Sequence, residues 1–389
     1  MTQLEALLSP QGQAVLDRLA GQELASDTSL RLGAELRRTY PADLVAAALA
    51  QHELRLKART KFTQAMRMFF TRPGLEQASP ELTAQHRARR YTGARHIADL
   101  CTGIGGDLIA LAQGRAALAV DLDPLHLRMA KLNAEVYGAG DAVTTVHADV
   151  RDVDLAGIDA VFIDPARRSG DHRLRTGHSE PPLDWCLALA DRVSMVGIKA
   201  APGLPHDMVP AGWELEFVAD RRDLKEAVLW SPALATTVRR ATILPAGDTL
   251  RSAPGPAVEI RPPGAFLLDP NPAVTRAGLV EELARTLDSW KIDEQIAFLS
   301  SPDEVRSPFA RTLRVIESAP WNEKHFARRL RALGIGAVDL RRRGLAGDVD
   351  QIHRRLKLQG DRRATVVMTR VQDLPWGLIC TALDPPRTS

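Results

Sequence analysis

The stretch DLCTGIGGD at residues 99–107 decides the fold of this chain, because it joins an apolar segment to an apolar helix through a glycine-rich turn. Residues 97–101 predict a buried strand, and residues 108–113 predict the helix that follows. Glycine has no Cβ, so the backbone of such a turn can pass close beneath a ligand. A strand, a glycine turn and a helix in this order are typical of ligand sites in open α/β sheets.

The alternation of strand and helix continues beyond this turn. Further strands are predicted over residues 117–122, 143–147, 160–163 and 194–200, with helices over 124–137 and 183–192. Residues 214–219 and 227–230 read as a final antiparallel pair. This rhythm predicts a parallel sheet with crossover helices, and we expect an α/β, Rossmann-like domain over residues 91–244.

The charges around the glycine turn indicate the kind of cofactor. Asp99 ends the first strand and Asp107 begins the helix, where a diphosphate would otherwise accept backbone N–H groups. The third glycine of a dinucleotide fingerprint is also missing, because its position is Leu108. Two carboxylates repel a diphosphate but favour a cation. The sequence therefore predicts S-adenosylmethionine (SAM), which carries an ammonium and a sulfonium and no phosphate.

Three more acids stand at successive strand ends, the edge where open α/β sheets bind ligands. Asp121 follows Gly103 by 18 residues and can accept ribose hydroxyls, and Asp149 falls where an adenine amino group would lie. Asp164 comes next to the expected methyl group, where it either orients and deprotonates a nitrogen or only caps its loop. Pro165 stiffens the turn that follows, so we expect Asp164 and Pro165 to take part in catalysis.

The remaining segments predict further domains around this one. Residues 1–90 read as a helical domain, with helices over 42–59 and 61–70 whose apolar stripe is core. Residues 245–278 are rich in Pro and Gly and are expected to form a linker or irregular connection. Residues 279–389 mix helix and strand and are expected to form a small α/β domain.

The net charge of +3, from 51 Lys plus Arg and 48 Asp plus Glu, hides a segregation. Residues 55–95 hold ten basic residues and two acids, and residues 320–389 hold fourteen basic residues and seven acids. Such patches suit a polyanion such as RNA, or they are solvated arginine-rich faces. The three widely spaced cysteines and the absence of a long apolar run predict an intracellular, cytoplasmic protein without disulfides or a membrane span.

Four motifs resemble those of class I SAM-dependent methyltransferases, and in particular the branch that contains the trimethylguanosine synthases. They are DLCTGIGGDLIALA, AVDLDP, AKLNAEVYG and HADV. The resemblance implies that Asp99, Thr102, Gly103 and Gly105 bind the methionine part of SAM, that Asp121 binds the ribose, and that Asp149 and Val150 bind the adenine. We add the adjacent Gly106 and Leu122 to these expected cofactor-binding residues. The fourth motif departs from that branch, because the Pro-Pro-Trp element that stacks on a methylated guanine is replaced by Asp164-Pro165-Ala166-Arg167.

The whole chain is also similar to bacterial methyltransferases with a helical N-terminus, an I-D-P-A-R-R motif and a C-terminal THUMP-like domain. The THUMP resemblance lies in FARRLRALGIGAVDLRRRG at residues 326–344 and implies binding of a structured RNA, such as tRNA or rRNA. In that setting Arg167 and Arg168 either clamp a substrate phosphate or form surface ion pairs.

These features leave three hypotheses for the function. The leading one is a SAM-dependent methyltransferase that acts on a base nitrogen in RNA. The alternatives are a small-molecule or protein methyltransferase, and a catalytically idle module that binds SAM and RNA. Uracil-C5 chemistry is disfavoured because the strand at 194–200 brings no nucleophilic cysteine, and the histidines show no metal-ligand spacing, so we expect no metal. The oligomeric state is left open.

Overall fold

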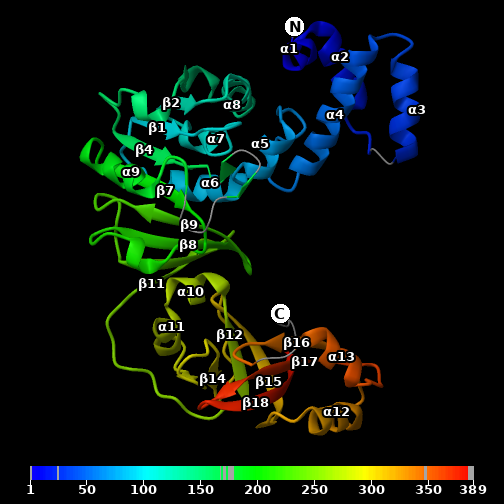
Figure 1. Cartoon of the computed structure of the whole chain (residues 1–389), viewed down its shortest axis with the longest axis vertical. Coiled ribbons are helices and arrows are strands. Elements are labelled where there is room, and N and C mark those ends of the chain that lie inside the picture. Colours follow the sequence, from blue (N-terminus) through cyan, green and yellow to red (C-terminus); the bar gives the residue numbers. More distant parts are fainter. Residues whose placement is uncertain are drawn as a thin grey trace, which may run out of the picture. The chain divides into compact units, whose positions relative to one another are not determined.

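In the computed structural model, the described residues are 2–23, 26–166, 168–169, 172–173, 179–345 and 348–383 (Figure 1). The chain divides into two compact units. Unit 1 comprises residues 1–213 and 228–235, and unit 2 comprises residues 214–227 and 236–389. Among the described residues, no helix combines the length and the apolar character that crossing a membrane requires.

The chain begins with helices whose first turns carry good capping residues. Thr2 forms a capping box with Glu5, and Ser9 caps the next helix ahead of Pro10. The helices before the first strand are α1 (Gln3–Leu8), α2 (Pro10–Leu19), α3 (Ser26–Leu36), α4 (Ala42–Ala58), α5 (Arg72–Gln77) and α6 (Glu81–Ala88). The apolar sides of α1 to α5 share one core with residues of helix α8, described below, whereas Ala84 and Ala88 of α6 belong to the core beside the parallel sheet.

The helix predicted over residues 61–70 does not form. These residues make turns, and their backbone groups bind side chains from elsewhere: Asn133 binds both the N–H and the C=O of Phe69, and Arg55 Nε donates to Met68 O at 2.8 Å. Such long-range hydrogen bonds replace the helical ones, so tertiary contacts override local propensity. The apolar stripe is nevertheless core as expected, since Phe62 is buried with its neighbours.

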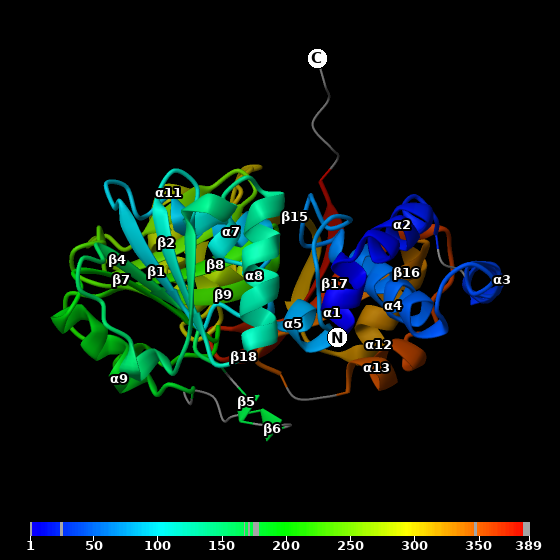
Figure 2. The ribbon, with the colours of Figure 1, turned by 90° about the horizontal axis from the view of Figure 1, so that it is seen from above.

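The parallel sheet that carries the glycine turn is present as predicted. Its parallel strands are β1 (His96–Leu100), β2 (Ala116–Asp121), β3 (Val143–His147), β4 (Ala160–Ile163) and β7 (Met195–Ala200). Helices α7 (Leu108–Leu111), α8 (Pro124–Val136) and α9 (Leu183–Ala188) connect them, and α8 packs on β2 and β3 (Figure 2). Short 3-10 turns are η1 (Gly140–Ala142), η2 (Val150–Asp152), η3 (Leu189–Asp191) and η4 (His206–Met208), and a separate small pair is β5 (Arg168–Ser169) with β6 (His172–Arg173).

The sheet continues through later strands of the chain. These are β8 (Glu214–Asp220), β9 (Asp223–Trp230), β10 (Arg239–Leu244) and β11 (Asp248–Arg251). The hydrogen-bonded order is β11-β10-β8-β9-β7-β4-β1-β2-β3. Because β1, β2, β3, β4 and β7 are parallel, their carboxyl ends share one edge, and this edge presents the acids identified in the sequence.

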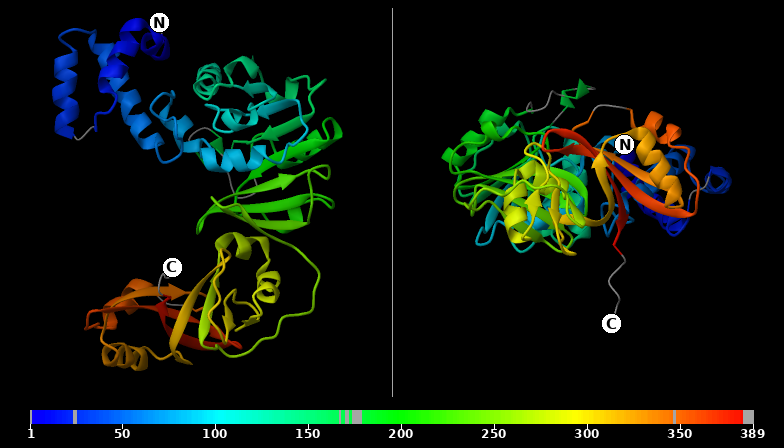
Figure 3. Two further views of the ribbon diagram at one scale, coloured as in Figure 1. Left: turned by 180° about the vertical axis from the view of Figure 1, so that it is seen from behind. Right: turned by 90° about the horizontal axis from the view of Figure 1, so that it is seen from below.

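Unit 2 contains a second, mixed sheet. Its strands are β12 (Phe266–Pro270), β13 (Trp290–Lys291), β14 (Leu299–Ser301), β15 (Ala310–Pro320), β16 (Ile335–Arg342), β17 (Arg362–Val371) and β18 (Leu374–Ala382), in the order β13-β14-β12-β15-β18-β17-β16. The helices of this unit are α10 (Pro272–Ala277), α11 (Val280–Thr286), α12 (Glu323–Ala332) and α13 (Val349–Arg355), and α10 packs on β8 and β10 (Figure 3). Residues 245–278 are therefore less irregular than expected, because they include β11, β12 and α10.

Candidate active site

The glycine turn is tied to the ends of β1 and β2 by side-chain hydrogen bonds. Thr102 Oγ1 donates to the buried Asp99 carboxylate. The Gly103 N–H donates to Asp121 Oδ2 at 2.7 Å, and the Asp123 N–H donates to Asp121 Oδ1 at 2.9 Å. Asp121 thus fixes the turn after β1 from the end of β2.

The glycines of the turn serve different purposes. Gly103 has φ +53°, and a Cβ added there would meet nothing within 4 Å, so its open side is available to a ligand. Gly105 has φ +85°, and its added Cβ would lie 3.0 Å from Ala130 Cα in α8. Gly106 packs in the same way against Ser79. Gly103 therefore has open space beside it, whereas Gly105 and Gly106 allow close packing.

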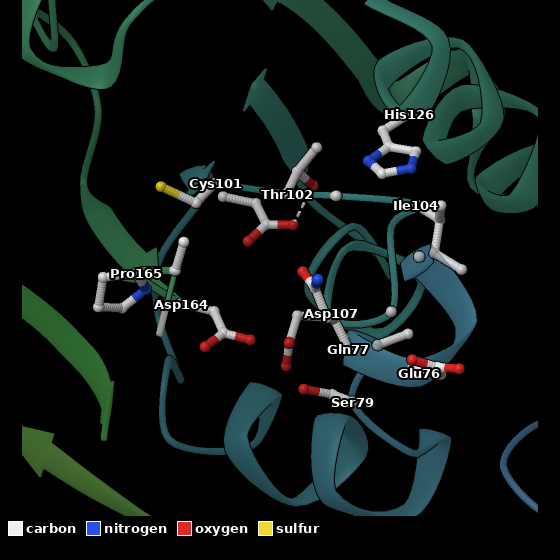
Figure 4. A pocket seen from close by; sticks show the side chains of 16 residues that line it. Glu76, Gln77, Ser79, Cys101, Thr102, Ile104, Asp107, His126, Asp164 and Pro165 are labelled. Carbon is white, nitrogen blue, oxygen red and sulfur yellow. Dashed lines mark hydrogen bonds between the residues drawn. The ribbon is translucent and has the colours of Figure 1, made fainter. Parts of the chain in front are cut away.

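A cavity of about 480 Å³ opens beside this turn (Figure 4). Six of the predicted site residues line it: Asp99, Thr102, Gly103, Gly106, Asp164 and Pro165. Gly105, Asp121, Leu122, Asp149 and Val150 are not among its lining residues. The cavity is therefore lined by Asp99, Thr102 and Gly103 from the predicted methionine site and by both residues predicted for catalysis, whereas Gly105 and the residues predicted for adenosine are not among its lining residues.

The sequence interpretation missed one wall of the cavity, which comes from α5 and the residues after it. Gly74, Glu76, Gln77, Ala78 and Ser79 line this side. Figure 4 shows the side chains of Asp107, Ser79 and Asp164 pointing toward the same part of the cavity.

This wall is held by side chains from distant segments. Lys61 Nζ donates to the carbonyl oxygens of Leu75 and Ala78 at 2.7 and 2.9 Å. Asn133 Nδ2 donates to Phe69 O at 3.0 Å and to Ile104 O at 2.9 Å, so it joins the segment before the wall to the glycine turn. Asn133 begins the N-A-E-x-Y-G run noted in the sequence, and that run was the available signal for this wall.

Two of the carboxylates that line the cavity form ion pairs with buried basic side chains of the protein. The buried Arg87 guanidinium donates from Nε to Asp107 Oδ1 at 2.9 Å. Lys199 Nζ lies 2.5 Å from Asp164 Oδ2 and 2.9 Å from Ser79 Oγ, and its side chain is only 8% exposed. The preference for a cation expected from Asp99 and Asp107 together therefore rests on Asp99.

Asp99 is poised to hold a positive charge. Burial, followed by the negative charge of Asp107, raises the pKa of the Asp99 carboxyl well above its usual value, against the lowering effect of the Thr102 hydrogen bond. A cation placed beside it would stabilise the ionised form. The open face of Gly103 and this buried carboxylate therefore fit the amino-acid part of SAM.

The residues predicted for adenosine lie at the ends of β2 and β3. Leu122 exposes 65% of its surface, as an apolar platform would. Asp149 instead pairs with Arg151, at 2.6 Å from Nη2 and 2.9 Å from Nε, and this hydrogen bonding lowers the pKa of the Asp149 carboxyl. Val150, which follows it, is buried.

The predicted phosphate clamp falls outside what can be described. Arg167 lies outside the described residues, and Arg168 belongs to β5 but its side chain is likewise outside them. No group of three or more His, Cys, Asp or Glu gathers as a metal site in the described part of the chain.

Cysteine chemistry finds no support in this cavity. Cys101 lines the cavity, but burial and the nearby carboxylates, Asp121 first, raise its pKa far above the usual value. Burial also raises the pKa of Cys186 and of Cys380 to about 12. A nucleophilic thiolate is therefore disfavoured at each position.

Comparison with known proteins agrees with this architecture. A family described as RNA cap guanine-N2 methyltransferase matches residues 94–181, a THUMP domain-like family matches residues 310–382, and a domain of unknown function matches residues 1–58. A methyltransferase crystal structure from Porphyromonas gingivalis W83 is 19% identical and superposes with a TM-score of 0.73, covering 94% of this chain and all of that one. The fold is therefore that of a class I methyltransferase with a C-terminal THUMP-like domain.

Two curated SAM-dependent methyltransferases of Mycobacterium tuberculosis, from strains CDC 1551 and H37Rv, are each 36% identical to this chain over 314 residues. The match covers 78% of this chain and 84% of each relative. The chain belongs to this family of SAM-dependent methyltransferases, and SAM is its cofactor.

Proposed function

We propose that this methyltransferase transfers the methyl group of SAM to a base nitrogen in a structured RNA, such as tRNA or rRNA. The observation that carries the proposal is the Lys199–Asp164 pair, which places an oriented carboxylate in the cavity beside the glycine turn. The RNA methyltransferase family match and the THUMP domain-like match support RNA as the substrate.

The cofactor-binding roles follow from the positions of the residues. Asp99 and Thr102, with the backbone at Gly103, would hold the methionine part, and Gly105 and Gly106 would shape the turn beneath it. Asp121 would accept the ribose hydroxyls, Leu122 would pack on the adenine, and Asp149 with Val150 would contact its edge. Bound SAM supplies an electrophilic methyl group on its sulfonium.

Asp164 is the proposed proton acceptor. Lys199 engages Oδ2 of this carboxylate, which leaves Oδ1 to accept a hydrogen bond from an attacking amine and orient its lone pair. As the nitrogen–carbon bond forms and the carbon–sulfur bond breaks, the nitrogen releases its proton to Asp164 or to water. Pro165 lines the same part of the cavity and restricts the backbone there.

The substrate is proposed to differ from a cap guanine. The element after β4 holds Pro165 and Ala166 where the trimethylguanosine synthases have stacking residues, so an aromatic platform for a methylated guanine is missing at these positions. A structured RNA presented by the THUMP-like part fits better than a cap.

Part of the N-terminal basic segment is used within the fold. Arg55 and Arg87 are buried, and Lys61 binds backbone carbonyls. These side chains stabilise the fold of unit 1. Lys57, Arg59, Arg67, Arg72, Arg89 and Arg95 of the same segment are exposed, so the support for RNA from charge comes from both basic regions.

Transfer of a tritiated methyl group from SAM tests the proposal. The acceptor is total RNA from cells of the source organism that lack the gene, and nucleoside mass spectrometry then identifies the product. We expect methylation of one nucleoside, reduced about 100-fold or more by Asp164→Ala with binding of S-adenosylhomocysteine (SAH) retained. Transfer to protein or small molecules instead, or transfer to nothing, would contradict the RNA assignment and favour one of the two alternatives.

A further inference from the structure

Several guanidinium groups converge on one buried carboxylate within unit 2. The side chain of Asp269 in β12 is only 5% exposed. Arg222 Nη2 donates to its Oδ2 at 2.9 Å, Arg341 Nη1 donates to the same oxygen at 2.6 Å, and Arg343 Nη2 lies 3.5 Å from Oδ1. Arg311 stands opposite Asp269 in register on β15. We call Arg222, Arg311, Arg341 and Arg343 the Asp269 arginine cluster.

Positive charge exceeds negative charge in this cluster. The other carboxylate that contacts it is Asp339, which lies 3.0 Å from Arg341 Nε and 3.9 Å from Arg311 Nη1. Four guanidinium groups therefore share two carboxylates among the described residues. The arginine side chains are 26% to 39% exposed, so an anion from solvent can reach them.

The cluster also has more donors than the acceptors can use. Each guanidinium carries five N–H groups in a planar fork. Arg343 stacks over the Phe298 ring at 4.5 Å, and its Nη1 is buried without a hydrogen-bond partner among the described residues. Burial and the neighbouring guanidinium groups lower the pKa of Arg222, against the attraction of Asp269. An added anion would relieve this repulsion.

We propose that the Asp269 arginine cluster binds a backbone phosphate of the RNA substrate. This inference rests on the proposed function, and it assigns the phosphate contact to a definite place in unit 2. A phosphate group has enough oxygen atoms to accept hydrogen bonds from two guanidinium groups at once. A single carboxylate has two oxygen atoms and cannot satisfy all the N–H donors of the four arginines. Arg311, Arg341 and Arg343 lie within the THUMP-like match, whereas Arg222 and Asp269 are added from outside it.

The rival explanation is a clamp that only fastens the turn between β8 and β9 to the rest of unit 2. Arg222 serves this purpose, since it also donates from Nη1 to Asp269 O at 3.2 Å. A clamp needs one guanidinium for its carboxylate, however, and it gains nothing from further cations that repel each other. The excess cations Arg341 and Arg343 are the residues on which the two explanations differ.

Salt-dependent binding of fluorescently labelled bulk tRNA to the full-length protein tests the proposal. The variant Arg341→Gln with Arg343→Gln leaves Arg222 on Asp269, and its control is Arg354→Gln with Arg363→Gln, which removes two exposed cations from α13 and β17. For the first variant we expect roughly 10-fold weaker binding and a salt slope that is smaller by about one to two. The control should change the affinity by less than about 3-fold.

Two further measurements make the result decisive. Arg341→Lys with Arg343→Lys keeps the charge and loses the fork, so it should keep the salt slope and bind with intermediate affinity. SAH affinity should be the same in all variants, because the SAH cavity is lined by unit 1, and thermal melting checks that each variant is folded at the temperature of the binding measurement. Equal tRNA binding by the glutamine variant and the wild type, or an equal loss in the control, would overturn the phosphate assignment. Wild-type protein that shows no salt-dependent tRNA binding would overturn the RNA proposal as well.

Discussion

At the scale of single residues, we expect the Asp99 carboxyl to make cofactor binding depend on pH. Its carboxyl has a raised pKa because it is buried near other carboxylates, so in the free protein it keeps its proton to higher pH than an ordinary aspartate. A bound ammonium favours the ionised form. Binding therefore releases a proton in the pH range between the lower pKa of the complex and the raised pKa of the free protein.

SAH affinity should accordingly rise with pH and level off once the free carboxyl is ionised. Calorimetry from about pH 5 to about pH 9, in buffers of different ionisation enthalpy, measures both the affinity and the released proton. Asp99→Asn should bind SAH more weakly and without this pH dependence. An affinity that falls with rising pH would contradict the role of Asp99.

Lys199 is the second residue whose role can be isolated. Lys199→Met keeps the length of the side chain but removes the ammonium that orients Asp164. We expect methyl transfer to slow about 10- to 100-fold while SAH affinity changes little, because Lys199 binds Asp164, the proposed proton acceptor, and does not line the cavity. Lys199→Arg should restore part of the rate. An equal loss of SAH affinity and turnover would mean that Lys199 only supports the fold.

At the scale of elements, the wall of the cavity depends on a segment that is neither helix nor strand. Residues 61–71 run through turns and end at Thr71, whose Oγ1 accepts from the Gly74 N–H and starts α5. Asn133 of α8 holds this segment and the glycine turn together. The side-chain amide of Asn133 thus connects the segment before α5 to the glycine turn.

Asn133→Ala should therefore weaken both folding and cofactor binding. It leaves backbone groups of Phe69 and Ile104 without their partner, at about 1–3 kcal/mol for each unsatisfied group. The melting temperature and the SAH affinity should both fall. Arg128→Ala, an exposed position on the same helix, is the control and should leave both unchanged. A normal SAH affinity in Asn133→Ala would show that the wall is held by other contacts.

At the scale of the whole molecule, cofactor and RNA are assigned to different units. The residues that line the cavity all belong to unit 1, and the Asp269 arginine cluster belongs to unit 2. Saturating SAH should protect backbone amides around residues 74–79 and 99–107 from hydrogen exchange, because a ligand stabilises the state to which it binds. Residues 310–382 should exchange as before. Protection confined to those C-terminal residues would contradict the placement of the cofactor.

The central sheet was the most predictable part of this protein. The observed bounds of β1, β2, β3, β4, β7 and α8 agree with the predicted bounds to within about one residue. Short apolar runs between turn residues are local signals, so the sequence alone locates them. The family membership followed from the same stretches. The helix expected over 61–70 was wrong because side chains from α4 and α8 take over its backbone groups.

The sequence by itself determined the sheet, the glycine turn and the preference for SAM, since these depend on residues close together in the chain. Only the tertiary structure decided which charges remain available at the site. Arg87 balances Asp107 across 20 positions, and Lys199 reaches Asp164 across 35 and Ser79 across 120. No local pattern specifies such partners, because they meet only when strands and helices pack. The same packing buries Arg55 and Arg87 of the N-terminal basic segment and gathers the arginines around Asp269.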